Sequence, residues 1–221
     1  YNMIIAIIGP PSSGKGTLAR EISKRINYKV ITTSEILKEK AKKDENFRKV
    51  FEESIKSGKL VPTEIVSEIV YNEIKNQKNL ILDGSPRTLY EANILKDFID
   101  VVIFIKVHKE IIIEKMQHRL VCPNCGKSYN DLDLEKEIDG IKYKLPKILP
   151  KEDLLCDNCK VKLVKRVDDT IETLEKRIEE YEKHTLPIIQ YYKCIGKKII
   201  EIWLNLPVEE LADKIINEIF K

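Results

Sequence analysis

Five short apolar segments recur along the chain, separated by longer amphipathic ones. They are Met3 to Ile8, Val30 to Thr32, Asn79 to Asp83, Val101 to Val107 and Ile199 to Leu204. Nearly continuous apolar residues over such lengths are typical of strands buried on both faces. Strands that alternate with helices predict an α/β fold, here a five-stranded parallel sheet with helices on both faces. Ligands of such sheets bind beyond the carboxyl ends of the strands.

The segments between the strands carry apolar residues at helical spacing. Thr33 or Ser34 can cap the second helix, Gly58 can end the third, and Pro187 should bend or interrupt a long one. The expected helices in the first half are Leu18 to Ile26, the segment from the cap to about Lys43, Asn46 to Ser57, the segment starting at Pro62 and the segment after Arg87 to about Phe98. Those in the second half are Glu110 to Arg119, a long helix that starts at Asp168, and Val208 to Phe220.

Residues 120–167 break this alternation. Paired cysteines, prolines, glycines and charges alternate there with short β-like runs, which indicates a small inserted domain. Two Cys-x-x-Cys pairs lie thirty residues apart, and four thiolates suit a tetrahedral Zn²⁺ ion; they are Cys122, Cys125, Cys156 and Cys159. A site with four protein ligands would be structural, holding together an insertion with little core of its own. The alternative is a metal-free insertion with free thiols.

A glycine-framed loop joins the first strand to the first helix. Residues 9–17, GPPSSGKGT, match the P-loop pattern G-x-x-x-x-G-K in the strand–loop–helix context that it requires. Backbone N–H groups and the helix N-terminus offer positive charge to a phosphate. Lys15 can reach the β- and γ-phosphates, and Thr17 is the hydroxyl partner expected for Mg²⁺. The alternative, a plain Gly/Ser turn, does not account for Lys15 or for both flanks.

Two other marked segments follow strands, Thr32-Thr33-Ser34 and residues 83–87, DGSPR. In a parallel sheet they should lie at the same edge as the P-loop. Asp83 ends a buried strand, so we interpret it as a carboxylate that orients Mg²⁺ through water. A cap of the following turn or helix is the alternative.

Composition limits the partners. The 221 residues carry a net charge of +3 without a long cationic tail, so neither nucleic acid nor an anionic membrane is expected. No apolar run approaches the ~18 residues of a membrane span, and no targeting segment is visible. We expect a cytoplasmic protein, with a mitochondrial location left open, and a monomer, because nothing in the sequence marks an interface.

Together these landmarks resemble the adenylate kinase family of nucleoside monophosphate kinases, in its long-lid form. The segments that carry the resemblance are Gly14 to Thr17, Thr32 to Lys38, Gly58 to Val61, Asp83 to Thr88, Lys115 to Arg119, Cys122 to Tyr129 and Arg166 to Arg177. It implies a P-loop NTPase-type core of residues 1–32, 62–119 and 168–221, a small helical NMP-binding domain of residues 33–61 and a zinc-ribbon lid of residues 120–167. The implied reaction is reversible phosphoryl transfer from Mg-ATP to AMP, giving two ADP.

The resemblance also implies roles for individual residues, and fixed cations suit a reaction in which the protein positions phosphates and neutralises their charge. Expected catalytic residues are Lys15, Arg87, Arg119, Arg166 and Arg177. Expected ATP-binding residues are Ser12, Ser13, Gly14, Lys15, Gly16, Thr17, Lys115, Arg119, Ser128 and Tyr129. Expected AMP-binding residues are Thr33, Lys38, Lys59, Leu60, Val61, Gly84, Ser85, Arg87, Glu91, Arg166 and Arg177. The stretch from Asp131 to Lys151 exceeds the usual lid spacing, which predicts an enlarged hairpin or another excursion of the chain at the lid tip.

Five positions depart from the family pattern: Lys38, Lys115 and Leu120 replace Arg, Ser85 replaces Phe, and Glu91 replaces Gln. An ionised Glu91 can only accept hydrogen bonds, and a mismatched edge against adenine costs ~1–3 kcal/mol. We therefore expect weakened use of AMP that Glu91→Gln improves. The alternative is that Glu91 faces solvent or pairs with a lysine, and that backbone groups near Lys59 to Val61 and Gly84 recognise adenine without it.

Three other functions compete with an active adenylate kinase. The first is a kinase with altered base choice, such as GTP as the donor or a different acceptor. The second is a nucleotide-binding protein with little turnover. The third, a zinc-ribbon module for nucleic acid, fits poorly with the near-neutral charge and the few aromatic residues of the ribbon.

Overall fold

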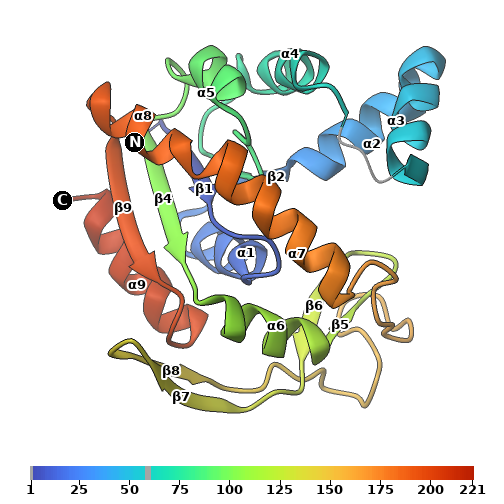
Figure 1. Cartoon of the computed structure of the whole chain (residues 1–221), viewed down its shortest axis with the longest axis vertical. Coiled ribbons are helices and arrows are strands. Elements are labelled where there is room, and N and C mark those ends of the chain that lie inside the picture. The colour runs from blue at the N-terminus through green and yellow to red at the C-terminus, as the bar shows by residue number, and fades with distance from the viewer. Residues whose placement is uncertain (1, 58–60) are drawn as a thin grey trace.

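A five-stranded parallel sheet forms the centre of the molecule, in the order β2-β3-β1-β4-β9 (Figure 1). The structure, a computed structural model, describes residues 2–57 and 61–221. The strands are β1 (Ile4–Ile8), β2 (Lys29–Thr32), β3 (Leu80–Asp83), β4 (Val101–Lys106) and β9 (Lys198–Trp203). Each of the five predicted strands is confirmed, with ends that differ by one residue in most cases.

Helices cover both faces of the sheet, as the apolar strands predict. Ile4, Ala6 and Ile8 of β1 face a cluster that includes residues of α4 (Thr63–Ile74), α5 (Leu89–Leu95) and α8 (Pro187–Cys194). Ile5 and Ile7 face the opposite cluster, with α1 (Lys15–Ile26) and α9 (Val208–Ile219). Among the described helices, none is both long and apolar enough to span a membrane.

Two further helices, α2 (Thr33–Lys43) and α3 (Glu45–Ser57), form an arm beside the sheet (Figure 1). The expected cap of α2 at Thr33 or Ser34 is wrong, because Thr32 caps this helix. The Thr32 side chain accepts from the Glu35 N–H, and the Glu35 side chain accepts from the Thr32 N–H, which makes a capping box. The expected end of α3 at Gly58 lies outside the described residues.

Three other helix predictions need correction. The helix expected to reach Arg119, α6 (Lys109–Gln117), ends earlier, and Arg119 begins a strand. The helix expected to reach about Phe98, α5, ends at Leu95. The long helix expected from Asp168 begins later, as α7 (Ile171–Glu180), with Thr170 as its N-cap. A π-helical turn (Tyr181–Thr185) interrupts it, and Pro187 occupies the first turn of α8, where a backbone N–H would have no partner within the helix.

The insertion forms two antiparallel pairs, β5 (Arg119–Val121) with β6 (Ser128–Asn130) and β7 (Leu134–Ile138) with β8 (Ile141–Leu145). The β7–β8 hairpin is confirmed, but its expected place at the lid tip is wrong. Leu134 and Tyr143 pack against Ile111 of α6 and close to Trp203 of β9. The Lys144 N–H donates to the Asn205 carbonyl oxygen at 2.8 Å. The hairpin therefore lies on the core.

Candidate functional site

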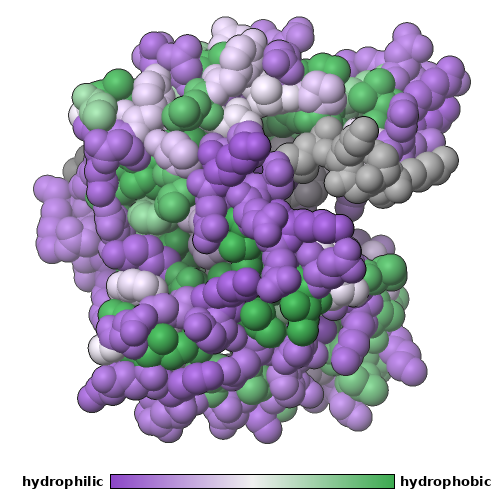
Figure 2. Space-filling view, viewed as in Figure 1, coloured by the Kyte–Doolittle hydropathy of each residue, from purple (hydrophilic) through white to green (hydrophobic). Residues whose placement is uncertain are grey.

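The loop between β1 and α1 forms a cradle for an anion. Gly14 caps α1 with a left-handed backbone (φ 98°) and no side chain, so N–H groups of the first turn are left for a ligand. A Cβ on Gly14 would lie 2.8 Å from Lys115 Nζ, so the lysine would have to move, and the positive φ of Gly14 disfavours any other residue there. Ser12 also has a positive φ of 58°, which is uncommon outside glycine. In Figure 2 the molecule is indented between the α2–α3 arm and the insertion.

Lys15 lies within a cluster of charged side chains. Its Nζ donates to the Pro10 carbonyl oxygen at 3.3 Å. Burial lowers the pKa of Lys15 to about 8, and the carboxylate of Asp83 opposes this shift. Three guanidinium groups reinforce the shift, those of Arg87, Arg177 and Arg119. Because such effects require proximity, the fold gathers cations from four separate segments of the chain around the P-loop.

Two adjacent acids hold the arginines near the ends of the insertion. Arg119 bonds both oxygens of Asp169, with Nε 2.9 Å from Oδ2. Arg166 contacts both oxygens of Asp168, at 2.9 and 2.6 Å. Arg177 Nη1 joins the same Asp168 carboxylate at 3.1 Å. Since carboxylate and phosphate fit the same guanidinium fork, these acids keep the arginines in an orientation suited to phosphate.

Sequence reasoning missed this role of Asp168 and Asp169, although both lie within a segment that carries the family resemblance. The available signal was an Arg-x-Asp-Asp run placed directly before a helix. Burial raises the pKa of the Asp168 carboxyl, but the hydrogen bond from Arg166 and the charge of Arg177 outweigh burial, so its pKa lies below the usual range. Asp168 is therefore ionised at neutral pH and holds the two cations together.

Lys115 approaches the P-loop from α6, on the side expected for the donor. Its Nζ donates to the Ser13 carbonyl oxygen at 2.7 Å. Burial, and then the charge of Arg119, lower the pKa of Lys115 to about 8. The Ser13 Oγ atom is buried and has no hydrogen-bond partner among the described residues. Two lysines with depressed pKa values thus contact the same loop.

The turn after β3 and the start of α2 line the other side of the site. Thr33 Oγ1 donates to the Gly84 carbonyl oxygen at 2.8 Å, and Arg87 Nε donates to the same oxygen at 2.7 Å. Glu91 lies beneath this turn and is 2% exposed. Its carboxylate accepts from Ser85 Oγ and from the Arg87 N–H. The alternative that placed Glu91 in solvent or beside a lysine is therefore wrong.

The other expected nucleotide-binding residues are dispersed. Lys38 is exposed on α2, and Val61 packs against the α2–α3 arm. Ser128 and Tyr129 lie on β6, but the Tyr129 side chain is buried and its hydroxyl oxygen is 3.7 Å from Cys156 Sγ. Lys59 and Leu60 fall outside the described residues.

Asp83 lies where it could hold a magnesium ion through water, beside the first turn of α1, which also carries Thr17. A Cβ on Gly16 would lie 3.2 Å from Asp83 Oδ2, so this carboxylate lies against the first turn of α1. It makes no hydrogen bond to any described residue. A carboxylate with free lone pairs beside a phosphate-binding loop fits a hard cation such as Mg²⁺.

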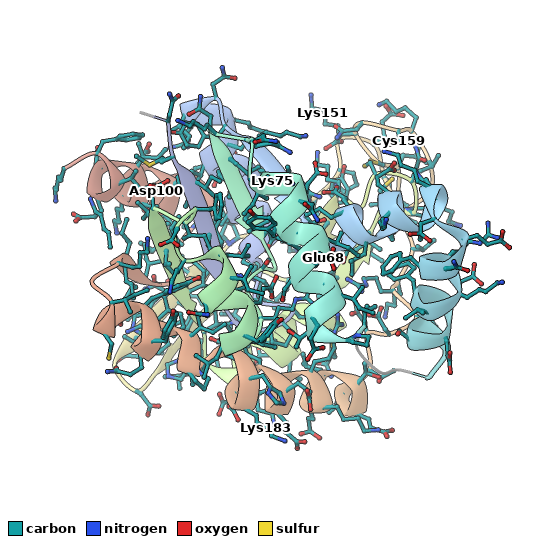
Figure 3. All side chains as sticks on the ribbon, turned by 90° about the horizontal axis from the view of Figure 1, so that it is seen from above. Glu68, Lys75, Asp100, Lys151, Cys159 and Lys183 are labelled. Atoms are coloured by element: carbon teal, nitrogen blue, oxygen red, sulfur yellow. The ribbon has the colours of Figure 1, made fainter. Side chains whose placement is uncertain are left out.

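The four paired cysteines come together in the insertion. Their sulfur atoms all lie within 4.8 Å of one another. Zn–S bonds of ~2.3 Å place the sulfurs of a tetrahedral site ~3.8 Å apart, so this cluster is compatible with zinc. Figure 3 shows Cys159 and Lys151 in one lobe at the edge of the molecule, away from the sheet and Asp100. Cys194 is exposed on α8, apart from this cluster.

Comparisons with known proteins agree with this geometry. A family model described as adenylate kinase matches residues 7–197. The chain belongs to the adenylate kinase family. It is 34% identical to the adenylate kinase of Kosmotoga olearia over 98% of this chain and 99% of that protein. It is 35% identical to that of Thermoanaerobacter sp. strain X514 over 96% of both chains, and 34% identical to that of Petrotoga mobilis.

Family membership confirms three predictions from the sequence: the P-loop fold, the class of enzyme and the class of substrate. The protein is a nucleoside monophosphate kinase, a phosphotransferase that acts on nucleotides. The gathering of Lys15, Asp83 and the arginines at the carboxyl ends of the strands is the geometry that such a reaction requires.

Proposed function

We propose that this chain transfers the terminal phosphoryl group of Mg-ATP to AMP, giving two ADP, and that the reverse reaction uses the same site. The observation that carries the proposal is the cluster of cations around Lys15. Among the charged groups that shift the pKa of Lys15, three are arginines and only one, Asp83, is a carboxylate. The fold itself does not require several positive charges to lie so close together. It suits a polyanion with several phosphate groups.

On the donor side, the P-loop from Ser12 to Thr17 would hold the β- and γ-phosphates, with Lys15 as the principal charge and Lys115 beside it. Thr17 and Asp83 would hold Mg²⁺, Asp83 through water, and the ion would offset the negative charge of the phosphates. Ser128 would complete the proposed donor site from the insertion, and Tyr129 would contribute through its backbone, because its side chain is buried beside Cys156. Zn²⁺ at the four cysteines would be structural, because four protein ligands leave no open position.

On the acceptor side, Arg87 is the proposed ligand of the AMP phosphate, together with Arg166 and Arg177. The other proposed AMP-binding residues are Thr33, Lys38, Lys59, Leu60, Val61 and Gly84, whereas Ser85 and Glu91 would act on AMP through the turn that carries Arg87. The residues would be distributed over the proposed core (1–32, 62–119 and 168–221), the NMP-binding domain (33–61) and the lid (120–167). We further propose a monomer in the cytoplasm.

Catalysis would arise from positioning and charge. The guanidinium groups of Arg119, Arg166 and Arg177 are already fixed by Asp168 and Asp169, so little reordering is needed when phosphate oxygens replace a carboxylate. Arg119 and Arg166 lie at the ends of the insertion, so its closure would bring them onto the phosphates and exclude water. No covalent nucleophile is required for such a transfer.

A coupled assay over a panel of donors and acceptors tests the proposal. We expect ATP with AMP to be the fastest pair. GTP as the faster donor, or another monophosphate as the faster acceptor, would favour a kinase with altered base choice. Binding of ATP without turnover with any acceptor would contradict the proposal and favour a nucleotide-binding role.

A further inference from the structure

Glu91 is a buried acid at the start of α5, directly under the turn that carries Arg87. Its side chain is 2% exposed, and both carboxylate oxygens are engaged. Oε1 accepts from Ser85 Oγ, and Oε2 accepts from the Arg87 backbone N–H at 2.7 Å. The Glu91 N–H donates to Thr88 Oγ1 at 3.2 Å, which fixes the start of the helix. Glu91 therefore holds the turn through hydrogen bonds to two of its residues, Ser85 and Arg87.

Arg87 is held at three places along its length. Besides the bond from its N–H to Glu91, its carbonyl oxygen accepts from Thr185 Oγ1 at 2.8 Å. Its Nε donates to the Gly84 carbonyl oxygen at 2.7 Å. Both the backbone and the root of the guanidinium group are thus fixed. The guanidinium charge acts on Lys15, so the fixed group lies at the phosphate end of the site.

The carboxylate depends on its two donors. Burial raises the pKa of the Glu91 carboxyl, and the hydrogen bonds from Ser85 and Arg87 oppose that shift. A buried acid without donors would cost several kcal/mol as an ion, so the hydroxyl of Ser85 and the Arg87 N–H are what make this position acceptable for a carboxylate. Ser85 and Glu91 therefore act as a pair.

We propose that Glu91 is a positioning residue for Arg87: the Ser85–Glu91 pair fixes the turn so that the guanidinium group meets the phosphate of the acceptor. The inference rests on the proposed function and deepens it. Glu91 then acts on a group that all nucleoside monophosphates share. Its influence on the acceptor should be independent of the base, which differs from the expectation that Glu91 contacts adenine.

Four variants separate these roles. Glu91→Gln keeps an oxygen for the Arg87 N–H and lets the amide nitrogen donate to Ser85 Oγ. Glu91→Leu removes both contacts, and Ser85→Ala removes one donor. Ser67→Ala is the matched control, because Ser67 is also a fully buried hydroxyl, on α4, and donates to the Thr63 carbonyl oxygen at 2.6 Å.

The measurement is kcat and KM for ATP, for AMP and for the fastest other monophosphate among GMP, CMP and UMP, with calorimetric binding of AMP. Glu91→Leu should raise the KM for both acceptors by the same factor, on the order of tenfold, and leave the KM for ATP within about twofold. Glu91→Gln should stay within about twofold of the wild type for every substrate. Ser85→Ala should lie between these variants, and Ser67→Ala should change no KM.

Three results would overturn the inference. An unchanged KM for AMP in Glu91→Leu would remove the link to Arg87. A changed ratio of AMP to the second acceptor in Glu91→Leu and Glu91→Gln would show contact with the base. Equal loss for ATP and AMP, as in a globally weakened fold, would make the pair structural only. Should Glu91→Leu not fold, Ser85→Ala and Glu91→Gln decide. A wild type without turnover contradicts the proposed function instead, and AMP calorimetry on the variants still tests the positioning.

Discussion

The hydroxyl oxygen of Tyr143 lies 2.7 Å from Nδ1 of His108, and this contact joins the β7–β8 hairpin to the start of α6. The His108 backbone N–H also donates to this hydroxyl, at 3.2 Å. The His108 ring stacks on Trp203 of β9, with centroids 4.7 Å apart. One tyrosine thus connects the insertion to two elements of the core.

The Tyr143 contact predicts a graded loss of stability. Tyr143 is 1% exposed, so Tyr143→Phe should remove hydrogen bonds worth about 1 kcal/mol, whereas Tyr143→Ala should cost about 3–5 kcal/mol through the cavity it leaves. Urea unfolding measures both values. Tyr90→Phe is the control, because Tyr90 is 50% exposed and should change little. Equal stability of Tyr143→Ala and the wild type would show that the hairpin does not depend on this anchor.

Lys15→Ala should lower kcat by about two to three orders of magnitude, because a preorganised charge on the transferring phosphate is worth about 3–4 kcal/mol. The fold should persist, since Lys15 contributes one weak bond to Pro10. Lys24→Ala is the matched control on the same helix, where the lysine is 74% exposed. Near-normal turnover in folded Lys15→Ala would contradict the assignment of the P-loop.

The lysines at the P-loop predict a pH limit for the donor. The pKa values of Lys15 and Lys115 are both lowered to about 8, so each is charged below pH 8 and loses its charge as the pH rises through that value. The kcat/KM for ATP reports the free enzyme, so it should fall above pH 8. In Lys115→Gln the fall should be less steep, because one group remains. A profile that is flat to pH 10 in the wild type would contradict this prediction.

The cysteine cluster predicts about one zinc ion per chain, measured by elemental analysis. A chelator should lower the melting temperature, because a metal that binds only the folded insertion stabilises it. The sheet core should stay folded, as it shares no ligand with the site. Cys194→Ser should leave the zinc content unchanged, whereas Cys156→Ser should reduce it. Protein with no metal and four reactive thiols in the cluster would rule out this site.

The sequence was a good guide where one signal dominated. The strands were evident because residues such as Ile4 to Ile8 are buried on both faces. Such a continuous apolar run shows neither helical spacing nor an alternation of apolar and polar residues. The α2 cap was missed because three hydroxyl residues stand in a row, and only the reciprocal bonds between Thr32 and Glu35 select one of them. Neighbouring residues with the same preference for the N-cap position can be distinguished only by the local backbone geometry, which the sequence does not show.

The site was predictable as a set of cations but not as a network. The P-loop and the four arginines followed from the motifs. The roles of Asp168 and Asp169 did not, because a charge run is usually solvated and its partners lie up to 50 residues away in the chain. The position of the hairpin was missed for a similar reason. Its alternation of charged and apolar residues indicates that one face is buried, but not which part of the molecule that face packs against.

The anchored hairpin changes how the rest of the insertion can move. Asn130 and Ile148 exchange two backbone hydrogen bonds, of 2.9 and 2.7 Å, where the chain enters and leaves the hairpin. The cysteine-bearing head is therefore tethered on two sides, to α6 and α7 at one side and to the hairpin at the other. A body held at two edges has fewer degrees of freedom than one on a single hinge, so we expect the proposed closure towards the P-loop to follow a restricted set of rotations.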